Sequence, residues 1–456
     1  MQFDDEYDEE DYGDAESGRR LPLLTGITPP RIVRGNELAM EELLEERERP
    51  KSGMRMAFMN MANSIIGAGI IGMPYSFRQA GLGMGIILLV VLTVIVDWTI
   101  QLIAINTKLS GTDSFQATMQ HCFGKSGLVA ISVAQWAFAF GGCIAYCIII
   151  GDTFPHVMTA LFPGIENVPV LSLLANRRAA IVIFTLGISY PLTLYRDISK
   201  LAKASAFALV SMAIIVFTVV VQGISIPASE RPDTTNDHIK LINTGIFQAV
   251  GVISFAFVCH HNSLLIYASL KTPTLNRFAT VTHYSTSISM LFCILMACAG
   301  YLTFRSTTSA NVLNNFASTN TMANIARLCF GFNMLTTLPL EAFVCREVME
   351  EYYFPGEPFN YARHLILSTA LVVSALSVSL ITCDLGAVFE LIGATSACAL
   401  AYVLPAVCYI KLATRSWRTW AAAAVAVFGG VVMVISLAQS FWKMARDDGT
   451  PVQCGW

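Results

Sequence analysis

The chain has 456 residues, of which 54% are hydrophobic and 13% are charged, and its formal net charge is −3. Ordinary soluble domains are about 45–50% apolar and about 25% charged, so the composition excludes a soluble protein and predicts a polytopic membrane protein. The loops show no nucleophile–base constellation and no cluster of metal ligands, so we do not expect an enzyme. We also expect no nucleic acid partner.

The chain begins with a polar segment, residues 1–50, that precedes the first apolar run. Residues 1–18 are rich in acidic residues and contain no basic residue, a composition that cannot bury enough apolar surface to fold alone. We therefore predict a disordered acidic tail over 1–50, which could dock a cytoplasmic partner. A membrane domain is expected over 51–442 and a short non-cytoplasmic tail over 443–456.

Eleven apolar segments are long enough to cross a bilayer, for which about 20 residues are needed. They cover approximately residues 53–77, 82–107, 126–152, 178–195, 201–223, 241–269, 276–304, 321–346, 365–382, 384–411 and 419–442. A polar segment at 113–124 is predicted to form an interfacial helix between the second and third spans.

The distribution of basic residues in the short loops predicts the orientation of the chain. Lysine and arginine are more frequent on the side that shares the N-terminus, and basic residues also precede the first span. Because basic loops stay in the cytoplasm, the N-terminus is expected there. With eleven spans, the C-terminus is then lumenal or extracellular.

The first span contains an unusual stretch, NSIIGAGIIGMPY, from Asn63 to Tyr75. It holds Gly67, Gly69 and Gly72, followed by Pro74. Within a helix, glycine costs about 1 kcal/mol relative to alanine and proline about 3 kcal/mol. We predict a broken helix whose backbone opens to a ligand. The alternative is close helix packing through small residues.

Ten spans plus one predict two five-helix repeats and an extra helix. In inverted repeats, broken helices occupy matching positions, so the first and sixth spans should both be interrupted. In the sixth span, Gly251, Ser254 and the polar cluster 259–262 interrupt an apolar run. We predict a break within 251–262, with an ordinary kink as the alternative.

Three motifs carry a resemblance to a known family. They are NSIIGAGIIGMPYSFRQAG, SFAFVCHHNSLLIYASL and LIGATSACALAYVLPAVCYIKL, in the first, sixth and tenth spans. Over nearly all of residues 53–442 the chain resembles the amino acid/auxin permease superfamily, and within it sodium-coupled neutral amino acid transporters and fungal vacuolar amino acid transporters. The resemblance implies an all-α protein of eleven transmembrane helices, with a LeuT-type 5+5 inverted repeat plus one helix. It also implies cation-coupled amino acid transport by alternating access.

An amino acid substrate needs a receptor for its carboxylate. The N-terminus of a half-helix offers free N–H groups and a favourable dipole without a charged side chain. Gly67, Ala68 and Gly69 are the predicted donors, because their small side chains let the carboxylate reach the backbone.

The substrate ammonium needs acceptors, for which we predict carbonyls of Asn63, Ser64, Ser254 and Phe255. Phe255 and Phe257 are expected to cover the substrate side chain, the alternative being core or lipid-facing aromatic residues. Neither broken stretch contains an acidic residue. A neutral substrate is therefore favoured.

The resemblance implies a sodium ion between the first and eighth spans. Carried over to this sequence, its ligands are the carbonyls of Asn63 and Ile66 and the hydroxyls of Thr336 and Thr337. A sodium ion takes oxygen ligands such as carbonyls and hydroxyls. Pro339, a helix-breaking residue, follows the two threonines, which suits such a site. The alternative for the threonines is hydrogen bonding to their own helix.

Ionisable residues within spans are candidates for coupling to protons. His260 changes charge in the pH range of an acidic organelle, and Lys203 could replace the sodium ion through its ammonium group. We expect structural polar contacts for Asp97 and Glu390, and a position at the membrane interface for Glu341.

These observations predict a secondary active transporter of neutral amino acids, coupled to Na⁺ or H⁺, without any other cofactor. Its partners are the amino acid and membrane lipid. An amino acid sensor that signals through residues 1–50 is the alternative, and a passive channel is disfavoured by the buried site. We expect a vacuolar or lysosomal-type membrane, with the plasma membrane or endoplasmic reticulum as alternatives.

Overall fold

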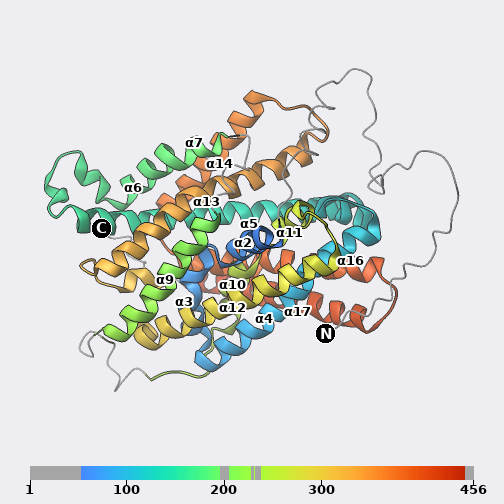
Figure 1. Ribbon diagram of the computed structural model, residues 1–456, viewed down its shortest axis with the longest axis horizontal. Coiled ribbons are helices and arrows are strands. Elements are labelled where there is room, and N and C mark those ends of the chain that lie inside the picture. Colours follow the sequence, from blue (N-terminus) through green and yellow to red (C-terminus); the bar gives the residue numbers. More distant parts are fainter. Residues whose placement is uncertain (1–52, 196–204, 227–230, 232–237, 447–456) are drawn as a thin grey trace. The chain divides into compact units, whose positions relative to one another are not determined.

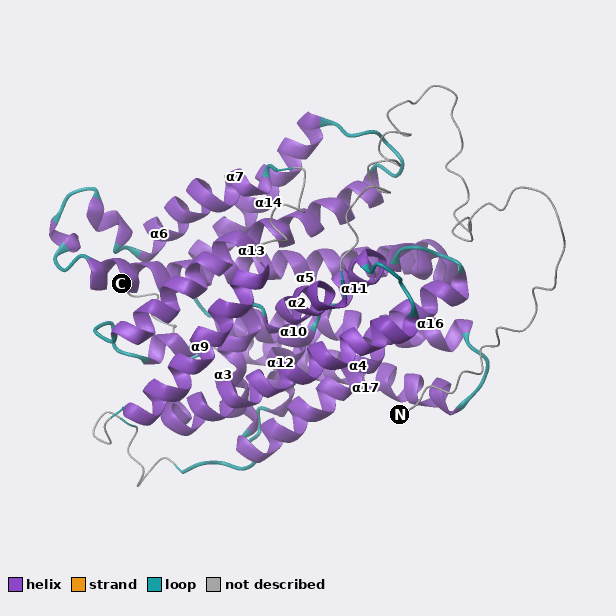
Figure 2. Ribbon diagram, in the orientation of Figure 1, coloured by secondary structure: helices purple, strands orange, loops and turns teal. Residues whose placement is uncertain are grey.

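The computed structural model describes residues 53–195, 205–226, 231 and 238–446 (Figure 1). The predicted tail at 1–50, most of the predicted C-terminal tail and Lys203 lie outside these residues. Within them the chain folds into helices joined by loops, with no strand (Figure 2). The expected all-α architecture is thereby confirmed for the described residues.

The α-helices follow one another along the chain with short 3₁₀ or π-helical segments between some of them. They are α2 (Met54–Ile66), α3 (Met73–Ala80), α4 (Leu82–Ser110), α5 (Phe115–Leu161), α6 (Arg177–Phe184), α7 (Tyr190–Thr193), α9 (Ser205–Ser225), α10 (Ile246–Phe257), α11 (His260–Ser269), α12 (Leu275–Phe304), α13 (Thr321–Tyr353), α14 (Tyr361–Ile381), α15 (Leu385–Ile392), α16 (Leu404–Leu412) and α17 (Trp417–Arg446).

Ten helical stretches of the described chain are long and apolar enough to cross a membrane. The predicted fourth span, 178–195, corresponds to α6, a π-helical segment η4 (Thr185–Ser189) and α7 in direct succession. This stretch is slightly shorter than the others, and with it the helices account for the eleven predicted spans.

The predicted interfacial helix is continuous with the third span except at one residue. Gly124 has φ 63° and ψ −147° inside α5, a conformation that glycine adopts without a steric penalty. It separates residues 115–123 from the long apolar remainder of α5. The polar segment therefore ends at Gly124, as predicted from the sequence.

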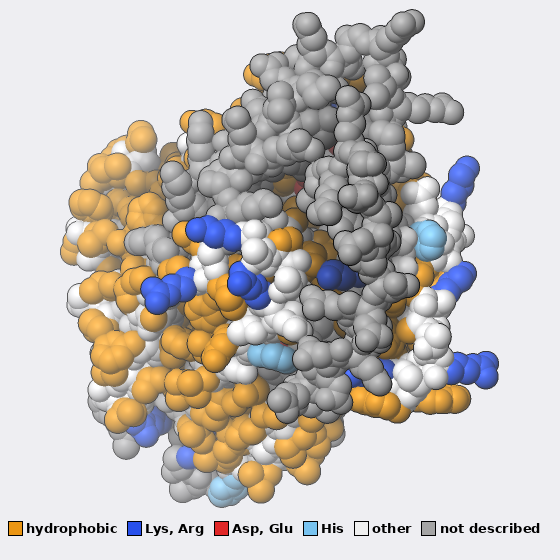
Figure 3. All heavy atoms as spheres, turned by 45° about the vertical axis from the view of Figure 1, so that its right-hand side comes forward, with side chains coloured by type: hydrophobic (Ala, Val, Ile, Leu, Met, Phe, Trp, Pro, Cys, Tyr) orange, Lys and Arg blue, Asp and Glu red, His pale blue; other side chains and the backbone are white. Residues whose placement is uncertain are grey.

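The helices pack in two groups that matter for the site. In one group, α12 packs on α2, α3 and α4, and α10 and α11 pack on α2 and α4. In the other, α13 packs along α5, and α14 packs on both. Many side chains that point away from the core are large and apolar, for example Val94, Val133 and Ile381. Figure 3 shows broad areas of such side chains, as lipid contact requires.

Candidate functional site

The first span is interrupted at Gly67, where α2 ends. Gly67 has φ 23° and ψ −145°, and its N–H donates to the carbonyl of Asn63 at 3.0 Å. A 3₁₀ segment, η1 (Ala68–Gly72), follows, and α3 begins at Met73 with Pro74 in its first turn. Proline is tolerated there because the first turn has no helical partner for its N–H.

Gly69 lets the two interrupted spans approach each other closely. A Cβ at Gly69 would overlap the Cβ of Ala256 and would lie 2.5 Å from its Cα. Ala256 is in the last turn of α10. The interrupted part of the first span therefore packs directly against the sixth span, next to the second break.

The sixth span is interrupted at Val258 and Cys259, between α10 and α11. Val258 is extended, with φ −76° and ψ 104°, and α11 begins at His260. The break lies within the predicted 251–262 but beyond Gly251 and Ser254, which are both in intact helix.

Gly251, which the sequence suggested as an interruption of the helix, instead has a packing role. A Cβ at Gly393 would overlap the carbonyl of Gly251, and a Cβ at Gly251 would lie 2.9 Å from the carbonyl oxygen of Glu390. Gly393 begins a π-helical segment, η8 (Gly393–Ala397), of the tenth span. The backbones of the sixth and tenth spans therefore touch at these glycines.

Two of the predicted ammonium acceptors already have donors. The carbonyl of Ser254 accepts from the N–H of Val258 at 3.2 Å, and that of Asn63 accepts from Gly67. The Ser254 hydroxyl shares a hydrogen bond with Tyr402 Oη at 2.9 Å. Ser254 thus ties the sixth span to the tenth, rather than presenting a freed carbonyl.

A small cavity of about 30 Å³ lies where the two breaks meet. Residues of the first, third, sixth and eighth spans line it: Ser64, Ile65, Gly67, Ala68, Gly69, Phe138, Gly142, Tyr146, Phe255, Ala256, Val258, His261 and Glu341. The predicted residues Ser64, Gly67, Ala68, Gly69 and Phe255 are thus brought together. Asn63, Ser254 and Phe257 are not part of this lining.

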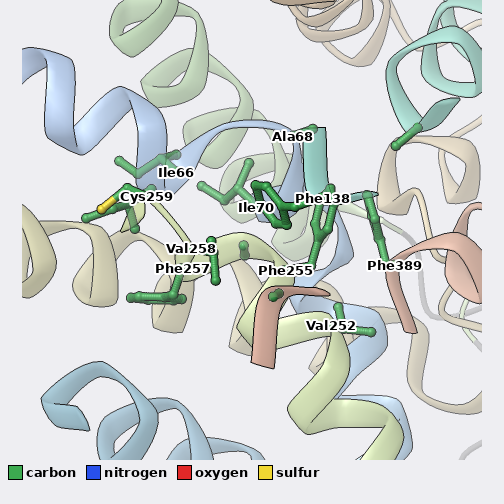
Figure 4. Close-up of a cluster of buried hydrophobic side chains, with 14 of the residues drawn as sticks. Ile66, Ala68, Ile70, Phe138, Val252, Phe255, Phe257, Val258, Cys259 and Phe389 are labelled. Carbon is green, nitrogen blue, oxygen red and sulfur yellow. The ribbon is translucent and has the colours of Figure 1, made fainter. Parts of the chain in front are cut away.

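Aromatic rings close one side of the cavity. Phe255 lies between Phe138 and Phe389, with ring centroids 5.6 Å and 4.7 Å away. Figure 4 shows this group, with Phe257 lying apart from it. Phe257 is fully buried and belongs to the core, so of the two predicted aromatic residues only Phe255 faces the cavity.

The cavity contains one carboxylate, which the sequence analysis placed at the membrane interface. Glu341 Oε1 lies 3.7 Å from His261 Nε2, and the two side chains are 13% and 2% exposed. The expected interfacial position is therefore wrong. Because α13 has 33 residues and extends beyond the length that a bilayer requires, position along the sequence does not give depth.

His260 and its neighbour His261 contact different helices: His260 contacts α4 and His261 contacts α13. Its Nε2 lies 3.0 Å from the Thr99 hydroxyl on α4, and the residue is 1% exposed. It does not line the cavity. His260 therefore stays a candidate for proton coupling, but it could act on the cavity only indirectly, through its contact with α4.

The predicted sodium ligands on the eighth span bond to their own helix. Thr336 donates to Asn333 O at 3.0 Å and Thr337 donates to the same carbonyl at 2.8 Å. The described residues contain no group of three or more His, Cys, Asp or Glu side chains that could hold a metal ion. The sodium set with Asn63 and Ile66 stays a prediction.

Two further acidic residues bridge pairs of helices. Glu390 accepts from Tyr75 Oη at 2.9 Å and from Gln79 Nε2 at 3.3 Å, which joins the tenth span to α3. Asp97 on α4 lies 2.7 Å from His283 Nδ1 on α12. Both arrangements are polar contacts between helices, as expected from the sequence.

A larger groove of about 870 Å³ lies at the end of α5 and the start of α13. Its lining includes His156, Thr159 and Asn324 but no residue of either broken span. By volume alone, this groove would be the candidate substrate site. We instead assign the candidate site to the small cavity, because interrupted helices leave backbone groups without helical partners.

Sequence comparison gives the same family over the whole membrane domain. The model of the family described as "Transmembrane amino acid transporter protein" matches residues 50–444. "Vacuolar amino acid transporter 2" of Saccharomyces cerevisiae is 42% identical over 417 residues, covering 89% of this chain and 86% of the relative. "Putative sodium-coupled neutral amino acid transporter 11" of Danio rerio is 38% identical over 405 residues, covering 87% and 88%.

Structural comparison supports the fold independently. A crystal structure of a mutant manganese transporter from Eremococcus coleocola superposes with a TM-score of 0.57 at 13% identity. The match covers 87% of this chain and 88% of that one. At this identity the likeness shows a shared LeuT-type arrangement of helices and says nothing about the substrate.

Proposed function

The chain belongs to the transmembrane amino acid transporter family, and from this premise we propose that it moves a neutral amino acid by alternating access, coupled to Na⁺ or H⁺. It is an amino acid transporter and not an enzyme. The single observation that supports the site is the contact between Gly69 and Ala256. It brings both broken helices to one cavity.

The cavity offers groups suited to each end of a zwitterion. Backbone N–H groups at the start of η1, from Ala68 and Gly69, suit the carboxylate. The carbonyl of Ser64 is the acceptor proposed for the ammonium. Phe138 and Phe255 present apolar surface to the side chain. A neutral side chain is favoured because no lysine or arginine lines the cavity and its one carboxylate already faces His261.

Binding must widen the site. One water molecule takes up about 10–15 Å³ of a cavity measured in this way. The cavity of about 30 Å³ therefore has room for a few water molecules but not for an amino acid. The lining comes from both packing groups, with α2, α10 and α11 on one side and α5 and α13 on the other. A displacement between these groups would enlarge the cavity and open it to one side of the membrane.

The name of the yeast relative supports our proposal of a vacuolar or lysosomal-type membrane. The proposed cytoplasmic N-terminus rests on the distribution of basic residues in the loops. The described residues contain nothing that favours the sensor alternative over transport. A cytoplasmic partner for residues 1–50 remains a proposal from composition alone.

Uptake into proteoliposomes tests the proposed function. Radiolabelled alanine, leucine and glutamine would be supplied with a Na⁺ gradient or a pH gradient imposed separately. We expect accumulation above equilibrium with one of the two gradients. Absence of both accumulation and exchange for every neutral amino acid tried would overturn the proposal. If sodium is the coupling ion, Thr337→Ala should remove its effect.

A further inference from the structure

We propose that Glu341 and His261 together bind the proton that drives transport. This inference rests on the proposed function, and it assigns the coupling ion and its position. Both side chains line the cavity between the two breaks. The site is distinct from the predicted candidates His260 and Lys203.

The pair connects the two packing groups. Glu341 is on α13, which packs on α5 and α14, whereas His261 is at the start of α11, which packs on α2 and α4. Their separation of 3.7 Å therefore depends on how the groups are placed. A displacement that widens the cavity would change this distance directly.

The charge balance of the cavity favours one proton on the pair. No lysine or arginine lines it. The titratable neighbours of Glu341 are Tyr146 and Cys143 on α5, with Cys345 beside Cys143. None of them carries a positive charge. An ionised Glu341 beside a neutral His261 leaves a negative charge without a counter-ion, and burial disfavours such a charge. One added proton makes the pair neutral overall.

The structure also provides a place for that proton. His261 Nε2 lies 2.9 Å from Asn262 Nδ2 and 3.7 Å from Glu341. In the neutral ring, Nε2 accepts from Asn262 and Nδ1 carries the hydrogen. In the protonated ring, Nε2–H is a donor and Glu341 is the nearest carboxylate. Within the described chain, Glu341 Oε2 and His261 Nδ1 are buried without a hydrogen-bond partner, so both groups have unused capacity.

This arrangement couples the proton to the conformation. When the groups separate and water enters, the ionised form of Glu341 is hydrated and the proton leaves to that side. When the cavity narrows again, the charge is desolvated unless a proton is bound. Proton binding therefore favours the narrow form, and by linkage the narrow form favours the proton.

The test compares Glu341→Gln with Glu351→Gln, the same change at an exposed position of α13. Proteoliposomes would receive radiolabelled alanine, leucine and glutamine under a pH gradient without sodium, and counterflow would be measured at equal pH. We expect wild type and E351Q to accumulate substrate. E341Q should lose at least about tenfold in accumulation while its counterflow stays within about threefold of wild type.

A second variant and a second measurement keep the inference testable if E341Q does not fold. His261→Gln should give the same loss of pH-driven accumulation with counterflow retained. In detergent, adding substrate to wild type should cause protons to be taken up or released, which a pH-indicator dye would record. Neither variant should show this proton exchange.

Three results would overturn the inference. One is pH-driven accumulation at the wild-type level in E341Q. Another is substrate accumulation by wild type driven by a sodium gradient alone. That result would contradict the proton inference but not the proposed amino acid transport. A third is loss of substrate binding in E341Q at every pH, which would make Glu341 a substrate ligand. By contrast, no counterflow in wild type would refute the proposed function itself.

Discussion

The breaks in the first and sixth spans both line the small cavity, but they have different physical origins. The first lies at Gly67, in a left-handed backbone conformation, and is followed by a helix that starts with proline. The second lies at Val258 and Cys259, with neither glycine nor proline at the break. Local backbone preference explains the first break. The second depends on contacts with other spans.

The contacts around the second break support this difference. His260 at the start of α11 bonds to Thr99 of the second span. On the other side of the break, Ser254 bonds to Tyr402 of the tenth span. The two halves of the sixth span are thus held by different neighbours, and Val258 between them is extended.

The largest effect is expected where the two breaks meet. Gly69→Leu would force the first span away from Ala256, since even a Cβ overlaps that residue. Uptake and substrate binding should fall at least about a hundredfold, while the protein still inserts. The matched control is Gly430→Leu in α17, where a Cβ meets nothing within 4 Å. Normal uptake by Gly69→Leu, measured in proteoliposomes, would refute the site.

A somewhat smaller effect is expected from Gly393→Ala. Its Cβ would overlap the carbonyl of Gly251 and push the sixth and tenth spans apart. We expect a lower unfolding temperature in detergent and about a tenfold loss of uptake. If Gly251 and Gly393 were hinges instead of packing contacts, the unfolding temperature would stay at the wild-type value.

Gly67→Ala tests whether the first break is local. Gly67 has a positive φ with ψ −145°, and a non-glycine residue held in such a sparsely populated region costs about 1–3 kcal/mol, which corresponds to about five- to 150-fold in an equilibrium. Uptake should fall by that order. A Cβ there would meet backbone oxygens only at 3.6 Å or more, so steric contact is not the cause. Uptake equal to wild type would show that the strain is relieved elsewhere.

The smallest effect is expected from Ser254→Ala. The change removes the hydrogen bond to Tyr402, which contributes about 1 kcal/mol to stability. Substrate affinity should stay near the wild-type value, because Ser254 does not line the cavity. Tyr402→Phe should lower the unfolding temperature similarly. A large loss of affinity in Ser254→Ala would restore the original prediction of a substrate contact.

The sequence was sufficient for those features that local chemistry determines. Segment lengths and hydrophobicity gave the spans, and glycine and proline located the break at Gly67. Position in the repeat indicated the second break, but not that Gly251 is a packing contact. Glu341 was misplaced because membrane depth depends on how a long helix sits among its neighbours. The two threonines of α13 could not be assigned, since a hydroxyl that binds an ion and one that bonds to its own helix look alike in sequence.

A cryo-electron microscopy map of the transporter with leucine bound tests the central claim most directly. The account predicts density between the two breaks, with the carboxylate against the backbone of Ala68 and Gly69 and the side chain against Phe255. Density confined to the larger groove, beside His156 and Asn324, with none between the broken helices, would contradict it.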